Sequence, residues 1–264
     1  MFWFKRKKIV LDCFTSDIFT YENAKIDYAS KFIPKWWKEL PQVELSSNDT
    51  NMKYCRGFTE LYKNSFIMPF WGTLQIEVHD ISDGIISTNW YSNFTIDHAR
   101  KGDALEYHKR NQFKDFVDDK YTQVKIISPW YLTSKSKTNF MFSDPLWNRS
   151  DLTAYSILPG IVDFKFNNTT NVNIMIEHGT EKRIITFFPG DPVAMITPVT
   201  EDEIDLRNHL ESSEFINSRF STTSRFALEG FKGIKYKSAY NLRKNFMEEK
   251  EERDKSKCPF GFKK

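Results

Sequence analysis

The sequence predicts a mainly β protein: an antiparallel β-barrel or a two-sheet sandwich, with an N-terminal helical lead and C-terminal helices. Between residues 54 and 200, β-branched and aromatic residues come in runs of five to eight separated by Gly, Pro, Asn and Asp, as in strands joined by turns. No helical crossover lies between these runs, which argues against a parallel α/β sheet. After Pro198 the pattern becomes charged and helical, so helices are expected to follow the sheets.

Residues 1–53 are predicted to form an N-terminal strand and a Trp-rich helical lead. Residues 7–14 are β-branched or aromatic with weak alternation, which favours an opening strand. Pro34 fits the first turn of a short helix that contains Trp36 and Trp37 and ends at Pro41. The polar stretch 46–51 predicts a loop before the β region.

Residues 54–200 are predicted to form the barrel or sandwich domain. In the first clear strand Leu74, Ile76 and Val78 share one face, because side chains alternate along a strand with a period of two. One face of that strand should therefore lie in the core and the other in water. Eight runs of this kind occur, at residues 73–79, 84–91, 124–128, 139–142, 160–166, 172–176, 183–188 and 193–197.

Residues 201–264 are predicted to form a helical C-terminal extension. The segment from Thr200 to Glu203 has the form of a capping box and should open a helix that ends near Glu211. Residues 237–255 are strongly charged and form a second helical candidate.

Composition limits the classes of function. The 264 residues include 38 basic and 35 acidic side chains, too small an excess to predict a nucleic acid partner. A mean hydropathy of −0.55 and the lack of an apolar run of about 20 residues exclude a membrane helix. Three cysteines at unrelated spacings, together with the lack of a signal peptide, predict an intracellular protein that is not secreted.

The histidines allow one metal-site interpretation. Glu77 and His79 project to the same face of a strand, and His178 from a neighbouring strand would complete the two-histidine, one-carboxylate set of non-haem iron sites. The His-x-Asp triplet of iron oxygenases and the His-x-His of cupins are absent. The alternative is that these histidines form hydrogen bonds on the wet face of the sheet or in loops.

Four tryptophans and two lysines are candidates for ligand binding. The tryptophans lie at strand ends or beside Pro and Asn, where flat rings could stack on sugars or bases. The lysines form the basic–aromatic segment between Tyr131 and Phe140. The alternatives are that the rings fill the core and that the lysines lie in a solvated hairpin. The candidates are Trp71, Trp90, Trp130, Trp147, Lys135 and Lys137.

Several phrases spread over nearly the whole chain resemble an uncharacterised protein family of marine tailed bacteriophages, the cyanophages among them. The resemblance implies a phage gene product made in a bacterial cytoplasm, and the family has no activity to carry over. The phrases are residues 33–41 (IPKWWKELP), 55–58 (CRGF), 127–130 (ISPW), 157–163 (ILPGIVD), 190–193 (GDPV), 206–209 (LRNH) and 258–260 (CPF).

A local stretch is similar to the trimeric dUTPase and dCTP deaminase barrel. The segments Gly160-Ile-Val-Asp163 and 190–195 stand in the order and spacing of two of its motifs. The similarity implies that Asp163 would orient a water molecule against a phosphate beside Mg²⁺. The barrel's other motifs are absent here, and the alternative is that both glycines are ordinary turn residues. On its strand, Asp163 should share a face with Ile161 and Lys165, opposite an apolar even-numbered face.

The leading prediction is a non-catalytic phage accessory or virion-associated protein that binds a protein or glycan partner in the host cytoplasm or the virion. No nucleophile elbow, phosphate-binding loop or dinucleotide fingerprint is present, so the sequence points to no enzyme class and to no cofactor. Self-association stays open. The alternatives are a nucleotide hydrolase that uses Asp163 with Mg²⁺ and a non-haem iron oxygenase that uses His79 and His178.

Overall fold

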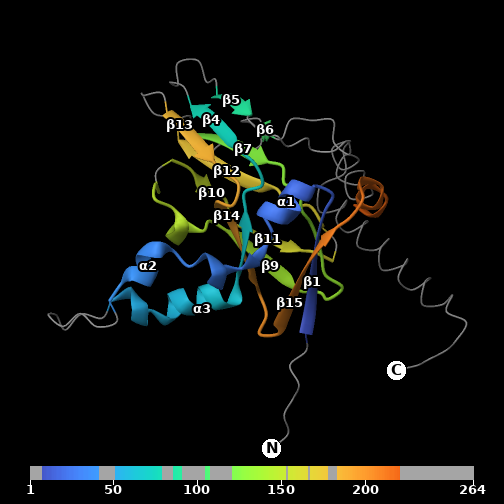
Figure 1. The fold of residues 1–264 in the computed structure, drawn as a ribbon, viewed down its shortest axis with the longest axis horizontal. Helices are drawn as coiled ribbons and strands as arrows, with labels where there is room; N and C mark the ends of the chain where they lie inside the picture. The colour runs from blue at the N-terminus through green and yellow to red at the C-terminus, as the bar shows by residue number, and fades with distance from the viewer. Residues whose placement is uncertain are drawn as a thin grey trace, which may run out of the picture.

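A computed structural model describes residues 8–41, 51–78, 86–90, 105–107, 121–152, 154–165, 167–177 and 183–220, with the backbone alone for residues 86–90 and 107. Four sheets surround one main hydrophobic core (Figure 1). Leu11, Ile76, Phe140 and Ile174 are fully buried there, and each comes from a different sheet. The predicted mainly β class is confirmed, as a sandwich-like arrangement in which the described strands close no barrel.

The first strand, β1 (Lys8–Thr15), is the centre of a three-stranded sheet. Its residues Ile9, Leu11 and Cys13 are buried, in keeping with the alternation of a strand that has one wet face. The neighbours of β1 are β15 (Glu203–Leu210), which runs parallel to it, and β8 (Tyr131–Thr133), which is antiparallel.

The helix predicted over residues 200–211 is wrong, because Glu203–Leu210 forms strand β15. Thr200 Oγ1 accepts a hydrogen bond from the Asp202 amide at 3.1 Å, so the supposed capping box closes a turn before the strand. Every residue of β1 pairs with one of β15. β1 and β15 lie outside residues 54–200, yet they form one sheet with β8 of that region.

The largest sheet has five antiparallel strands, and it carries the helical layer described below. Its strands in spatial order are β11 (Gly160–Asp163), β9 (Asn139–Ser143), β14 (Pro192–Pro198), β3 (Phe66–Pro69) and β2 (Asp27–Tyr28).

Two further antiparallel sheets complete the body. One consists of β10 (Ser156–Ile157), β12 (Val172–Glu177), β7 (Tyr121–Ile126) and β6 (Leu105–Tyr107). The other consists of β13 (Arg183–Phe187), β4 (Leu74–Val78) and β5 (Ile86–Trp90). All eight predicted runs of the β region, and the opening strand, overlap observed strands, although the run at 160–166 continues three residues past the end of β11.

The helices are short and lie outside the sheets. In Figure 1, α2 and α3 lie side by side at the opposite side of the body from the β1–β15 pair. The predicted Trp-rich helix is confirmed as α2, which follows Pro34. A helix over residues 213–220 follows β15, and the candidate at 237–255 lies outside the described residues. No helix in the described ranges is long and apolar enough to cross a membrane. The α-helices are α1 (Ile18–Asn23), α2 (Lys35–Glu39) and α3 (Arg56–Asn64), and the 3₁₀ turns are η1 (Ala29–Phe32), η2 (Met52–Tyr54) and η5 (Leu146–Asn148).

Candidate binding surface

The helical layer has a small core of its own against strands β3 and β14. Phe58 and Tyr62 lie one turn apart on α3, and their rings stack with centroids 4.5 Å apart. Trp37 of α2 stacks on the other side of this pair, with its ring centroid 5.3 Å from that of Phe58. Because residues four apart share a helix face, this face attaches α3 to the sheet. The buried members of the core are Ala29, Phe58, Tyr62, Ile67 and Met195.

Two tryptophans from distant parts of the chain lie together outside this core. Trp36 of α2 is 39% exposed and Trp147 of η5 is 44% exposed, and their ring centroids are 6.0 Å apart. The Trp36 indole N–H donates a hydrogen bond to the Trp147 backbone carbonyl at 3.0 Å. Phe58 makes edge contacts with both indoles, so each one is supported from the buried side. Leu146, the residue before Trp147 in η5, is 50% exposed, and we call Trp36, Leu146 and Trp147 the aromatic surface.

Helix geometry explains why Trp36 points outward. Successive residues of an α-helix are turned by about 100°, so two neighbouring tryptophans cannot both face the same core. Trp37 takes the inward position against Phe58, and Trp36 is left at the surface. The Trp36-Trp37 doublet was thus a signal for an exposed indole that the sequence analysis did not use.

Asn148 fastens the turn that carries Trp147 to the helical layer. Its Oδ1 accepts a hydrogen bond from the Tyr62 hydroxyl at 2.5 Å, and its Nδ2 donates to the Phe32 carbonyl at 2.6 Å. Burial raises the pKa of Tyr62, so the phenol stays protonated and remains a donor. The turn η5 is therefore tied to both α3 and η1.

A buried ion pair between Asp144 and Arg149 joins the two ends of the segment that contains Trp147. Arg149 Nη1 lies 2.7 Å from Asp144 Oδ2, and the two side chains are 6% and 9% exposed. The same Oδ2 accepts the Ile157 amide at 3.1 Å, and the guanidinium carbon lies 3.8 Å from the centroid of the Tyr155 ring. Burial raises the pKa of the Asp144 carboxyl, although the Ile157 amide and Arg149 both favour its charged form. These contacts fix the loop that presents Trp147.

The structure places some of the predicted binding residues at the surface and others in the core. Trp147 is at the surface, as a stacking residue must be. For Trp71 and Trp130 the prediction is wrong, because they are 1% and 0% exposed and belong to the main core. The side chain of Trp90 lies outside the described residues. Lys135 and Lys137 are exposed in the loop between β8 and β9, which belong to different sheets and form no hairpin.

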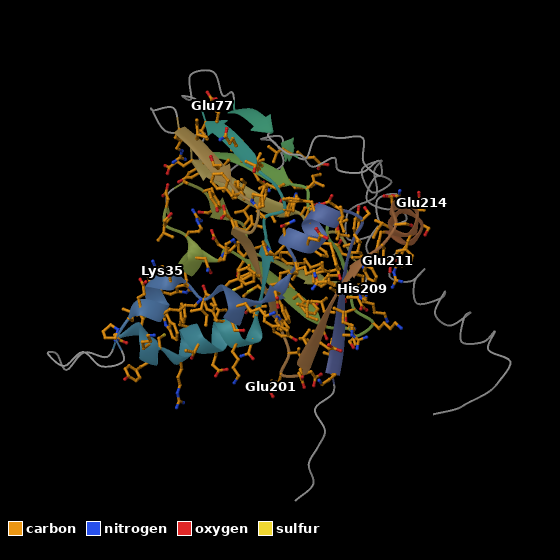
Figure 2. The ribbon with its side chains drawn as sticks, viewed as in Figure 1. Lys35, Glu77, Glu201, His209, Glu211 and Glu214 are labelled. Carbon is orange, nitrogen blue, oxygen red and sulfur yellow. The ribbon has the colours of Figure 1, made fainter. Side chains whose placement is uncertain are left out.

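The predicted iron site cannot be assembled from the described residues. His79 and His178 both lie outside them. Glu77 lies on β4, paired with Ile184 of β13 and Ser87 of β5, at the top of the view in Figure 2. In the part of the chain that the structure describes, no group of three His, Cys, Asp or Glu side chains lies close enough to hold a metal ion.

Asp163 ends strand β11, where its carboxylate closes a turn. Its Oδ1 accepts the Lys165 amide at 2.9 Å, and its backbone carbonyl accepts the Asn167 amide at 2.9 Å. Ile161 is exposed, as the predicted alternation requires, but β11 ends at Asp163, so Phe164 and Lys165 lie in the turn and share no strand face with it. Gly190, in the second dUTPase-like segment, has a φ of 92°, which favours glycine in a turn. Both features match the turn interpretation.

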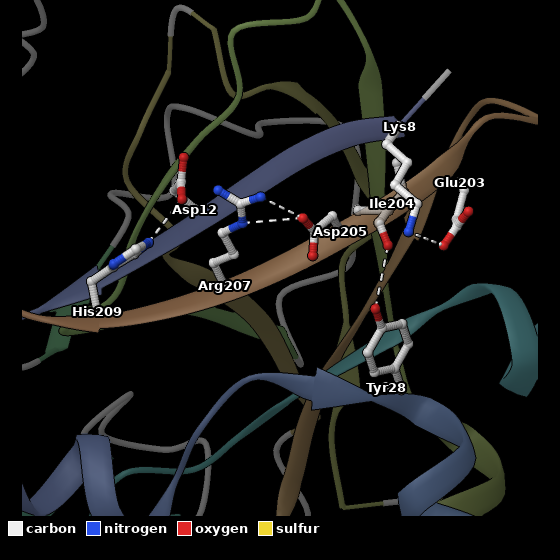
Figure 3. A network of polar contacts seen from close by, with 8 residues as sticks. All are labelled: Lys8, Asp12, Tyr28, Glu203, Ile204, Asp205, Arg207 and His209. Atoms are coloured by element: carbon white, nitrogen blue, oxygen red, sulfur yellow. Dashed lines mark hydrogen bonds and ion pairs between the residues drawn. The ribbon is translucent and has the colours of Figure 1, made fainter. Parts of the chain in front are cut away.

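The β1–β15 face carries a polar network that the sequence analysis missed, because it expected a helix there. His209 Nε2 lies 2.8 Å from Asp12 Oδ1, and the imidazole stacks on Phe14 with centroids 4.6 Å apart (Figure 3). The alternation from Glu203 to His209 was the available signal. The charges largely pair across and along the strands, which indicates a structural role. The other contacts are Lys8 with Glu203, Arg207 with Asp205, and the Tyr28 hydroxyl with the Ile204 carbonyl.

Comparisons with models of protein families, with curated proteins and with solved structures find no match for this chain.

Proposed function

We propose that this protein is a phage accessory or virion-associated protein that acts by binding another protein, and that the partner docks on the aromatic surface. One observation carries the proposal: two indoles remain 39% and 44% exposed beside a helical core in which Phe58 and Tyr62 are buried. Exposed apolar patches on proteins mark interaction sites, and tryptophan is enriched among the residues that dominate binding energy. The sequence resemblance to phage proteins supports the setting in the host cytoplasm or the virion.

The chemistry of the surface favours a protein over a glycan. Leu146 adds an exposed aliphatic side chain that offers nothing to sugar hydroxyls. The Trp36 indole N–H is already bound to the Trp147 carbonyl, and both ends of the Asn148 amide are engaged inside the layer. The surface thus offers apolar area more than free polar groups, which suits an apolar side chain of a protein partner.

The surface is also held rigidly before any partner arrives. Phe58 supports both indoles, Asn148 ties η5 to two helices, and the Asp144–Arg149 pair closes the loop. A pre-ordered surface loses less conformational entropy on binding, so more of the contact energy appears as affinity. The nucleotide-hydrolase alternative has no comparable support, since the Asp163 carboxylate already bonds within its own turn.

Site-specific photocrosslinking tests the proposal. Leu146 is replaced by photoreactive benzoylphenylalanine in the full chain, expressed in infected host cells, and Phe188, exposed in the turn after β13, carries the same group as the control. We expect one adduct of defined mass from position 146 and not from position 188. The yield should fall at least about 30-fold in a Trp36→Ala background, the effect of removing about 2 kcal/mol of binding energy.

Other adducts would contradict the proposal in different ways. An adduct that carries sugar and no peptide would show that the surface binds a glycan. An adduct that forms equally in the Trp36→Ala background, or equally from position 188, would show that the aromatic surface is not the docking site.

A further inference from the structure

We infer that Asn148 is a positioning residue of the docking surface: it acts through Trp147, and its side-chain amide holds that indole in place by joining η5 to α3 and η1. The inference rests on the proposed function and adds the interior contact on which docking depends. Trp147 and Asn148 are neighbours in η5, so the side chain of one presents the ring and that of the other anchors the turn.

Backbone hydrogen bonds close the turn η5 into one unit. The Asn148 amide donates to the Pro145 carbonyl at 2.8 Å, and the Arg149 amide donates to the Leu146 carbonyl at 3.1 Å. Bonds between residues three apart are those of a 3₁₀ turn, and they restrict the backbone within it. Leu146 and Trp147, the two members of the aromatic surface that η5 carries, therefore take their place from the anchoring of Asn148.

The chemistry of the two partners allows one orientation of the Asn148 side chain. The Phe32 carbonyl can only accept a hydrogen bond, so the amide nitrogen faces it, at 2.6 Å. The amide oxygen then faces Tyr62, whose hydroxyl donates to it at 2.5 Å. Burial raises the pKa of Tyr62, so the phenol keeps the proton that this contact needs. Position 148 therefore requires an acceptor and a donor on the two arms of one short side chain.

Both partners of the Asn148 amide are fixed by the small core of the helical layer. Tyr62 is 1% exposed in that core. Phe32 ends η1, where Ala29 is buried and donates its amide to the Ser65 carbonyl at 2.8 Å. Tyr62 is too deeply buried for a docked partner to contact it, so an effect of removing its hydroxyl alone would be transmitted by Asn148.

The contacts between the two indoles depend on where η5 is held. The Trp147 ring centroid lies 6.0 Å from that of Trp36 and 5.6 Å from that of Phe58, and the Trp147 carbonyl accepts the Trp36 indole N–H at 3.0 Å. If the Asn148 amide lost its partners, both indoles would lose order. A surface that is no longer pre-ordered has to lose more conformational entropy on binding, so its affinity falls.

The Asn148→Asp variant of the full chain tests the inference, because it keeps the size of the side chain and removes the donor. At pH 7 the introduced carboxylate would place a charged oxygen against the Phe32 carbonyl. The photocrosslinked adduct from position 146 should therefore fall at least about tenfold in yield. Tyr62→Phe, which removes the hydroxyl and keeps the ring on Phe58, should lower the yield about three- to tenfold.

Acid should reverse the effect of Asn148→Asp, which a general loss of structure would not do. A protonated carboxyl has an O–H that can donate to the Phe32 carbonyl and an oxygen that can accept from the Tyr62 hydroxyl, as the amide does. The measurement is ¹⁹F NMR of the chain with its seven tryptophans fluorinated, in which Trp147→Phe identifies the Trp147 signal. The difference between the variant and native signals, compared at the same pH, should disappear from pH 7 towards pH 4.

Asn23→Asp is the matched control. The exposed Asn23 amide also donates to a backbone carbonyl, that of Phe19, at 2.9 Å, but it lies on α1. This variant should leave the adduct yield and the Trp147 signal unchanged. Comparison at one pH also removes the contribution of Asp144, which lies in the same segment and is present in both chains.

The failures of the two proposals can be told apart. An unchanged adduct yield in Asn148→Asp and Tyr62→Phe would overturn the positioning role and leave the docking surface standing. A signal difference that persists at pH 4, or that extends equally to the core residues Trp71 and Trp130, would also overturn it. Tyr62→Phe decides the outcome if circular dichroism shows that Asn148→Asp folds poorly. The absence of any adduct from position 146 in the native chain would overturn the proposed function, and the NMR comparison would still decide whether Asn148 holds Trp147.

Discussion

Removal of Arg149 should destabilise the protein far more than removal of an exposed arginine. In an Arg149→Met variant the Asp144 carboxylate stays buried, with Oδ2 held by the Ile157 amide alone. Its Oδ1 already has no hydrogen-bond partner among the described residues. Breaking a buried pair by removing one partner costs about 3–5 kcal/mol, and we expect a loss of about 3 kcal/mol at pH 7.

The loss should shrink as the pH is lowered, and the sign follows from the pKa of Asp144. Burial raises this pKa above the unfolded value of about 3.9. At pH values between the unfolded and folded pKa values, the folded state therefore binds more protons than the unfolded state. The contribution of Asp144 to the free energy of unfolding is then greatest at low pH, and it declines as the pH rises through the folded-state pKa of this carboxyl. Without Arg149 the pKa rises further, so Arg149→Met should regain part of its stability at pH 5 relative to the native chain.

Urea unfolding followed by tryptophan fluorescence at pH 5 and pH 7 measures both effects. Arg207→Met, which removes an exposed arginine paired with Asp205, is the matched control and should leave the unfolding midpoint unchanged. Asp144→Asn/Arg149→Met should be more stable than Arg149→Met at pH 7, because it leaves no uncompensated buried charge. A loss below about 1 kcal/mol at pH 7, with no recovery at pH 5, would refute the buried-pair argument.

Three further predictions concern single residues. Trp71→Ala should cost about 3–5 kcal/mol of unfolding free energy, because it leaves a cavity in the core. Trp147→Ala, at the surface, should cost no more than about 1 kcal/mol. Thermal unfolding compares the two variants, and equal losses would contradict the assigned burial. Asn148→Ala should cost about 1–3 kcal/mol, since the Tyr62 hydroxyl and Phe32 carbonyl lose their partner; a neutral result in urea unfolding would show that η5 is not held this way. Asp163→Asn keeps the oxygen that accepts the Lys165 amide and should change the free energy of unfolding by about 1 kcal/mol at most. Hydrolysis of dUTP or dCTP with Mg²⁺ is measured for both chains as pyrophosphate release. Hydrolysis by the native chain that is lost in the stably folded variant would support the hydrolase alternative.

Strand positions were predictable because the pattern that specifies them is local. The alternation of Leu74, Ile76 and Val78 is visible within five residues, and β4 forms there. Pro34 likewise marks the start of α2 without any knowledge of the sheets. In β15 two local signals competed, a capping-box pattern at its start and a period of two within it. Pairing with β1, whose residues are each 195 positions from their partners in β15, favours the strand.

The sequence by itself determined that this chain would form β sheets with a Trp-rich helix beside them, since alternation and turn residues act over a few neighbouring positions. Only the tertiary structure decided which tryptophans are buried, because that depends on which sheet face meets another layer: Trp71 and Trp130 face the core, and Trp147 does not. It also decided where the candidate site lies. Trp36 and Trp147 are 111 residues apart, and no local pattern records that packing on Phe58 brings their rings within 6.0 Å of each other.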